Sequence, residues 1–276
     1  MSDESRRRLD GVTPQPGVPK PDPILLVQGT RRSFGGLRAV DVEHLEVERG
    51  AITALIGPNG AGKTTLFNVL TGFDRADAGT WRFDGVPLQR SRAHQIARMG
   101  MVRTFQLTKA LARLTVLDNM LLAAPAQRGE RFTGALGRSW RSQEGQNRQQ
   151  AQALLSRFGL ASMSGQFAGA LSGGQRKLLE MARSLMAGPR LLMLDEPMAG
   201  INPALRRSLL DHIDAIRQEG ATVVFIEHDM DVVMDISDWV VVMAEGRVIA
   251  EGPPAAVGRD PIVIDAYLGR RRRTGQ

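Results

Sequence analysis

Residues 57–64 decide the fold class of this chain, and they read Gly57-Pro58-Asn59-Gly60-Ala61-Gly62-Lys63-Thr64. An apolar, strand-like run at residues 51–56 precedes this segment, and a helix-compatible run at residues 63–70 follows it. Glycines between a strand and a helix let backbone N–H groups approach a phosphate, and the positive end of the helix attracts its charge. The pattern predicts a P-loop in an α/β fold, because a chance glycine-rich turn would not have both flanking elements.

The side chains at the end of this loop indicate which phosphate compound it binds. Lys63 supplies a cation for the β- and γ-phosphates of ATP, and the Thr64 hydroxyl is placed to bind Mg²⁺. Thr65 continues the same turn, and we include it among the nucleotide-binding residues. The loop therefore predicts ATP and Mg²⁺ as cofactors.

A second part of a nucleotide site follows the apolar run at residues 191–194, which ends in Asp195 and Glu196. A buried strand that ends in carboxylates places Asp195 where it can hold Mg²⁺, while Glu196 can polarise an attacking water. Many strands end in acidic residues, so this signal is weak alone. Together with the P-loop it predicts an ATPase.

Apolar runs typical of strands alternate with helical patterns along the chain, which predicts an α/β class. The runs lie at residues 24–28, 51–56, 191–194, 222–226 and 240–243, and residues 203–219 have the spacing of a helix. The stretch at about residues 109–171 lacks strong strands and is rich in Ala, Gln, Arg and Leu. We expect a helical subdomain there, inserted in the α/β core.

The two ends of the chain differ from this core. Residues 1–23 contain Pro14, Pro16, Pro19, Pro21 and Pro23, which predicts a disordered tail. Residues 270–276 begin with four arginines and are expected to form a basic tail, so the formal net charge of +7 is assigned mainly to solvated tails and not to a nucleic-acid surface. Cysteine is absent, and no apolar run reaches the ~18–20 residues that span a bilayer.

A further motif, Leu171-Ser172-Gly173-Gly174-Gln175, gives the chain a family resemblance. With the P-loop and the run ending in Asp195, residues 24–269 resemble the ATP-binding subunits of ABC transporters. The resemblance implies a RecA-like P-loop core with an antiparallel β subdomain and an inserted helical subdomain. It also implies that Ser172, Gly173, Gly174 and Gln175 contact an ATP held by a second cassette. The alternative is an ordinary helix N-cap at Ser172.

Other positions match the same family one by one. Gln106 resembles the glutamine that touches Mg²⁺ and relays site occupancy to the membrane subunits, and its alternative is a surface polar residue. His228 resembles the histidine that contacts the γ-phosphate, and its alternative is a structural histidine. Phe34 resembles the aromatic residue that stacks on adenine, with core packing as its alternative. Asn202 stands where the family often has aspartate, which puts any role of a carboxylate there in doubt.

Some details point to one branch of the family. The segments Ala199-Gly200-Ile201-Asn202-Pro203, Ile226-Glu227-His228-Asp229-Met230 and Ala266-Tyr267-Leu268-Gly269 resemble the subunit of branched-chain amino-acid importers, with urea and short-amide importers close by. Alternatives are an ATPase of lipopolysaccharide or lipid export and a nucleic-acid-binding ABC ATPase. The latter usually has a long coiled-coil insertion or zinc-binding cysteines, and neither is visible here.

The importer resemblance implies a set of partners and a place of action. These are integral membrane permease subunits, a second ABC cassette of the same or a different sequence and, indirectly, a solute-binding protein. No nucleic-acid partner is expected. The expected location is peripheral, at the cytoplasmic face of the cytoplasmic membrane.

Overall fold

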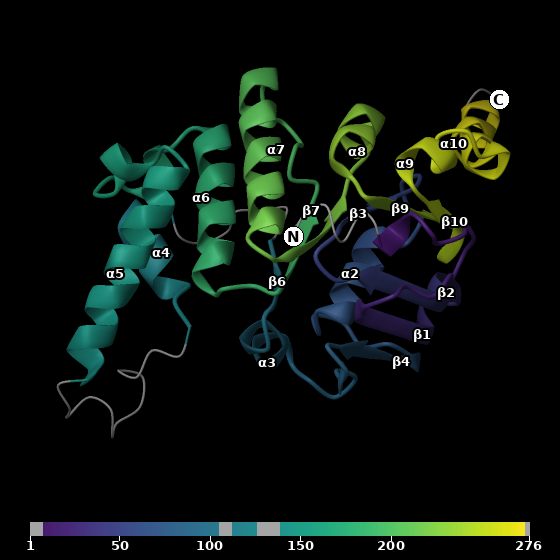
Figure 1. Cartoon of the computed structure of the whole chain (residues 1–276), viewed down its shortest axis with the longest axis horizontal. Coiled ribbons are helices and arrows are strands. Elements are labelled where there is room, and N and C mark those ends of the chain that lie inside the picture. The colour runs from purple at the N-terminus through teal and green to yellow at the C-terminus, as the bar shows by residue number, and fades with distance from the viewer. Residues whose placement is uncertain (1–7, 105–111, 126–138, 274–276) are drawn as a thin grey trace. The chain divides into compact units, whose positions relative to one another are not determined.

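A computed structural model describes residues 8–104, 112–125 and 139–273 of the chain (Figure 1). They divide into two compact units. We call residues 1–103, 190–198 and 210–276 the core unit, and residues 104–189 and 199–209 the helical unit. Within the described residues, no helix combines the length and apolar character needed to cross a bilayer.

The core unit is built on a six-stranded sheet. Its strands are β3 (Ile52–Ile56), β6 (Met101–Arg103), β7 (Leu191–Asp195), β8 (Thr222–Ile226), β9 (Trp239–Ala244) and β10 (Arg247–Gly252), in the spatial order β10-β9-β3-β8-β7-β6. All neighbours are parallel except β10, which is antiparallel to β9. Every residue of β3, β7 and β8 is buried, as expected of strands covered on both faces. The loops after these three strands meet at one edge of the sheet, which is where α/β proteins place their ligands.

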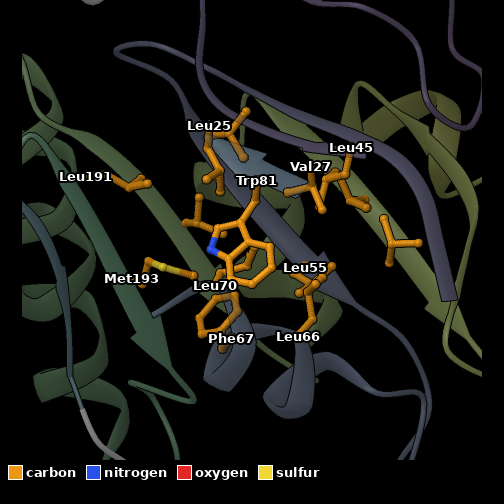
Figure 2. Close-up of a cluster of buried hydrophobic side chains, with 14 of the residues drawn as sticks. Leu25, Val27, Leu45, Leu55, Leu66, Phe67, Leu70, Trp81, Leu191 and Met193 are labelled. Carbon is orange, nitrogen blue, oxygen red and sulfur yellow. The ribbon is translucent and has the colours of Figure 1, made fainter. Parts of the chain in front are cut away.

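An antiparallel sheet packs on the helix that follows the P-loop. It contains β1 (Pro23–Phe34), β2 (Leu37–Glu48), β4 (Ala78–Phe83) and β5 (Val86–Pro87) in the order β2-β1-β4-β5. Figure 2 shows Trp81 of β4 in one apolar cluster with Leu66, Phe67 and Leu70 of α2 (Lys63–Leu70). Burial of each such side chain contributes roughly 1.5–3 kcal/mol. The predicted P-loop core and β subdomain are both confirmed.

Short helices complete the core unit. They are α3 (Ala93–Arg98), α8 (Met230–Ile236), α9 (Pro254–Val257) and α10 (Pro261–Arg273), together with the second half of α7 (Pro203–Gln218). The α10 backbone is helical through Arg270–Arg273, where a tail was expected. Arginine is a good helix former, so a run of arginines can extend a helix that has already begun.

The helical unit contains α4 (Val116–Leu122), α5 (Ser139–Arg157), α6 (Gly173–Met186) and the first half of α7, with short 3₁₀ turns at η2 (Ala161–Met163) and η3 (Ala168–Ala170). It is larger than the predicted insert at residues 109–171, because it includes α6. One face of α6 carries buried apolar residues such as Leu178 and Ala182, and this helix packs against both α4 and α5. The packing partners of α6 could not be read from its own sequence pattern.

Residues 8–22 also differ from the expectation of a disordered tail. Leu9 and Val18 belong to the hydrophobic cluster of the core unit. Lys20 is buried, and its Nζ donates to Glu251 Oε2 at 2.9 Å. Trp239 Nε1 donates to the same oxygen at 2.8 Å. The proline-rich composition indicated disorder, whereas the segment is held by a buried ion pair with a residue far along the chain.

Candidate functional site

The P-loop requires glycine at two positions for steric reasons. Gly57 and Gly62 have φ angles of +143° and +96°. A Cβ on Gly57 would lie 2.0 Å from the carbonyl oxygen of Met243, and a Cβ on Gly62 would lie 2.1 Å from that of Ala39. The loop after β3 is therefore closely surrounded by backbone, and no other residue type fits there without a shift.

Lys63 is the first residue of α2, and its side chain turns back over the loop. Its Nζ donates to the carbonyl oxygens of Gly57 at 2.7 Å and Pro58 at 3.1 Å. The N-cap residue Gly62 offers no side chain to the first turn of α2. The N-terminus of α2 and a buried ammonium thus lie at the same loop. This is the arrangement that binds phosphate, because backbone N–H groups and a cation both attract its charge.

A pocket of about 260 Å³ lies over this loop. Its lining consists of Glu196, His228 and the consecutive residues Asn59, Gly60, Ala61, Gly62, Lys63, Thr64 and Thr65. His228 Nε2 and Glu196 Oε1 are 2.9 Å apart. The pocket therefore brings most of the P-loop together with two residues that the sequence assigned to hydrolysis, Glu196 and His228.

Glu196 has an unusual backbone conformation. Its φ angle is +48°, in the left-handed region that non-glycine residues seldom occupy. Its N–H donates to the carbonyl oxygen of Ile226 at 3.1 Å, which ties the end of β7 to the end of β8. Strained residues concentrate at functional sites, where the surrounding structure holds them. The conformation supports a functional interpretation of Glu196.

The Asp195 carboxylate is buried at the end of β7. Its Oδ2 accepts from Arg103 at 2.7 Å, and Arg103 also donates to Asn68 Oδ1 at 2.6 Å. Its Oδ1 is buried without a hydrogen-bond partner. A buried carboxylate oxygen without a partner is costly, and oxygen ligands are what Mg²⁺ prefers. Asp195 therefore has the chemistry of a magnesium ligand.

Two residues near the site were not singled out from the sequence. Arg103 is aligned with Met193 in the parallel pair β6–β7, so it lies at the same sheet edge as Asp195. The sequence does show a basic residue at this position. It does not show that β6 pairs with β7, and this pairing brings Arg103 to Asp195. Glu227 follows β8 and is buried, and burial raises the pKa of its carboxyl group. It was quoted only as part of a family segment.

Phe34 is the last residue of β1 and is not among the residues that line the pocket. Its side chain is 48% exposed, which argues against the core-packing alternative. The Arg32 guanidinium carbon lies 4.4 Å from the ring centroid, and Arg32 is held by Asp74 at 2.9 Å and Asp77 at 3.1 Å. Hydrogen bonding, first from the Ser33 N–H and then from Arg32, lowers the pKa of Asp77. The ring is therefore an exposed aromatic surface backed by a fixed cation.

The signature residues lie in the helical unit, where Ser172 is the N-cap of α6. Its Oγ accepts from the Gln175 N–H at 3.2 Å, and Gln175 Oε1 accepts from the Ser172 N–H at 2.9 Å. A Cβ on Gly174 would lie 2.2 Å from Leu205 Cδ2, so the end of that half-buried side chain would have to move. At Gly173 a Cβ would meet nothing within 4 Å. Packing therefore gives no reason for glycine at 173.

Of the two remaining predicted positions, Asn202 lies within the described residues and Gln106 does not. Asn202 Oδ1 accepts from the Leu205 N–H at 2.9 Å, so the side chain caps α7. Asparagine and aspartate are comparable N-caps, and the replacement keeps this local role. Gln106 lies outside the described residues, and its role as a magnesium ligand stays a prediction.

Comparison with known proteins gives evidence on the family of this chain that does not depend on the pocket. Residues 40–199 match the family described as ABC transporter, and residues 247–272 match the family described as branched-chain amino acid ATP-binding cassette transporter. The chain is 43% identical to the high-affinity branched-chain amino acid transport ATP-binding protein BraF of Pseudomonas aeruginosa, over 90% of this chain and 98% of the relative. It is 42% identical to LivG of Escherichia coli K12, a protein of the same description, with the same coverage.

An archaeal relative and two solved structures agree with these matches. The probable branched-chain amino acid transport ATP-binding protein LivG of Archaeoglobus fulgidus is 41% identical over 89% of this chain and 95% of its own length. A nucleotide-free ATP-binding cassette of an ABC transporter superposes with a TM-score of 0.78 at 35% identity, covering 89% of this chain and 98% of that one. The ADP conformation of an ABC transporter cassette gives 0.77 at 35% identity, covering 90% and 99%.

Proposed function

This chain belongs to the ABC transporter family as an ATP-binding and ATP-hydrolysing subunit, and we propose that the transporter it powers imports branched-chain amino acids. The observation that carries the proposal is the identity of 41–43% to subunits described by that solute, over 95–98% of their lengths. The separate match at residues 247–272 supports the same branch.

Within the site, we assign the phosphates of ATP to the loop at residues 57–65 and to Lys63. Asp195, Thr64 and Gln106 would hold Mg²⁺, and the partnerless Oδ1 of Asp195 supports this assignment. When bound there, the ion supplies positive charge to the phosphate oxygens. Phe34 would offer its exposed ring to adenine, and the Arg32 guanidinium lies against the same ring.

Glu196 is assigned as the general base that takes a proton from the attacking water. His228 would hold Glu196 in place and contact the γ-phosphate, and the 2.9 Å separation of their side chains supports this pairing. Lys63 would stabilise the charge that develops on the transferred phosphoryl group. These roles require that the water and the γ-phosphate both enter the pocket over the P-loop.

We further propose that the site is completed by a second cassette. Ser172 and the α6 N-terminus would approach the γ-phosphate of an ATP bound by that cassette, and the open space at Gly173 supports a close approach from outside the unit. The cassettes would act beneath permease subunits at the cytoplasmic face of the membrane. A solute-binding protein would deliver the amino acid to the opposite side.

Solute uptake tests the proposed function directly. Cells that lack this chain are complemented with wild type or with Glu196→Gln, and uptake of labelled leucine, isoleucine and valine is measured beside labelled urea. We expect wild type alone to restore uptake of the three amino acids. Restored uptake of urea, with amino-acid uptake independent of this chain, would overturn the solute assignment while leaving the ATPase assignment in place.

A further inference from the structure

We propose that Glu227 is a positioning residue that ties the loop carrying Glu196 to His228, so that the two are held together in the geometry for hydrolysis. The inference rests on the proposed roles of Glu196 and His228. It assigns a role to a residue that neither lines the pocket nor belongs to the motifs from which those roles were inferred.

The carboxylate of Glu227 connects two loops at the edge of the six-stranded sheet. Its Oε1 accepts from the Met198 N–H at 2.9 Å, and Met198 lies two residues after Glu196. Its Oε2 accepts from the N–H of His228 at 3.2 Å. Each oxygen therefore holds one loop, and the side chain between them sets their separation.

A stability role alone does not explain a carboxylate here. Glu227 is only 4% exposed, and burial is the largest influence on its carboxyl group, raising its pKa. Burying a carboxylate is costly, and apolar replacement of buried charges is often neutral or stabilising. What the carboxylate provides is two acceptor oxygens in one plane for two backbone donors. Neither an apolar side chain nor an amide can supply both oxygens.

The two loops carry the groups whose separation matters for hydrolysis. Glu196 is held at a φ of +48°, and its carboxylate meets His228 Nε2 at 2.9 Å. Lys63 is instead held by carbonyl oxygens of its own loop. Loosening Glu227 should therefore disturb the groups assigned to water activation and leave the main phosphate-binding group in place.

The test replaces Glu227 by glutamine in the full-length chain. Glu227→Gln keeps the volume but turns one oxygen into an NH₂ donor, so either Met198 or His228 loses its acceptor. We expect kcat for ATP to fall between about tenfold and about a hundredfold, as for displacements of about 1 Å at a reacting centre. The KM for ATP and the Kd for a non-hydrolysable ATP analogue should stay within about twofold of the wild-type values. The substitution leaves the contacts that bind ATP in its ground state unchanged.

Glu251→Gln is the matched control. Glu251 is also a buried carboxylate of the core unit, and it accepts from a backbone N–H, that of Val18 at 3.0 Å, but it does not line the nucleotide pocket. This control should lower the melting temperature and leave kcat unchanged. If Glu227→Gln does not fold, Glu227→Asp serves instead, since it keeps the charge but is one methylene too short to reach both amides.

The possible outcomes separate this inference from the proposed function. A Glu227 variant that is folded and has wild-type kcat overturns the inference while the ATPase assignment stands. Equal losses of kcat and analogue binding also overturn it, because they indicate general disruption of the site. A wild-type chain that binds no ATP analogue overturns the proposed function, and the inference with it.

Discussion

The guanidinium of Arg103 donates to Oδ2 of Asp195 at 2.7 Å, and the two side chains are only 5% and 2% exposed. The contact joins residues 92 positions apart, and it leaves Asp195 Oδ1 without a partner. One oxygen of the proposed metal ligand is therefore fixed by a cation from the neighbouring strand, while the other is available. Arg103 orients the carboxylate and compensates its negative charge at a buried position.

Replacing Arg103 by methionine should destabilise the chain strongly. Removing one partner of a buried ion pair leaves an uncompensated charge, which typically costs about 3–5 kcal/mol. Arg190→Met is the control, because Arg190 pairs with Asp84 while 49% exposed, and exposed pairs contribute roughly 0–1 kcal/mol. Urea denaturation measures both variants. Similar free energies of unfolding for the two variants would show that the Arg103–Asp195 pair stabilises the fold no more than an exposed ion pair does.

Binding and turnover should separate at the P-loop. Lys63→Ala removes the buried ammonium that faces the loop and should abolish detectable ATP binding in isothermal titration. Glu196→Gln should keep ATP binding and lose phosphate release, because the amide cannot accept the proton of water. A Glu196→Gln protein that releases phosphate at the wild-type rate would remove Glu196 from the role of base.

The sequence could predict the parts of this site that are local. Strand, glycine-rich loop and helix at residues 51–70 are contiguous, so their motif gives both the fold and the phosphate site. The partners of Asp195 and Glu251 are not local, because they depend on the pairing of β6 with β7 and on the packing of residues 8–22. A single sequence with no pairing information reveals neither.

The steric requirement at Gly62 gives a further prediction. Gly62→Ala combines a φ of +96° with an overlap against the Ala39 carbonyl oxygen, so it should cost more than about 1 kcal/mol of stability and weaken ATP binding. Gly145→Ala in α5 is the control, since its Cβ would meet nothing within 4 Å. In a helix interior it should stabilise by about 0.5–1 kcal/mol. Thermal denaturation with and without ATP compares them, and a Gly62→Ala protein as stable as wild type would contradict the steric requirement for glycine in this loop.

Phe34 should contribute to ATP binding through its ring. Stacking of a base on an aromatic residue is worth about 1–3 kcal/mol. Phe34→Ala should therefore weaken ATP binding by that amount, and Phe34→Trp should preserve the binding. Inorganic tripolyphosphate lacks a base and should bind all three proteins equally. Because the side chain is 48% exposed, the melting temperature should change little. Unchanged ATP affinity in folded Phe34→Ala would remove Phe34 from the site.

The proposed sandwich of two cassettes predicts dimers that depend on ATP. Glu196→Gln should dimerise with ATP but not with ADP, because the γ-phosphate would bridge Lys63 of one cassette to Ser172 of the other and persists when hydrolysis is blocked. Light scattering measures the association. It is run at several protein concentrations because the homodimer would be weak if the transporter pairs two cassettes of different sequence.

Two changes at Ser172 in the Glu196→Gln background identify the contact. Ser172 caps α6 through its Oγ, so both Ser172→Ala and Ser172→Arg lose the cap, at a cost of about 1 kcal/mol. Only Ser172→Arg adds bulk where the phosphate of the facing cassette would lie. We expect Ser172→Ala to dimerise more weakly than its parent and Ser172→Arg not to dimerise. If Ser172→Arg dimerises with ATP as readily as its parent, the two cassettes do not meet through this helix terminus, and the α6 N-terminus serves only to begin the helix.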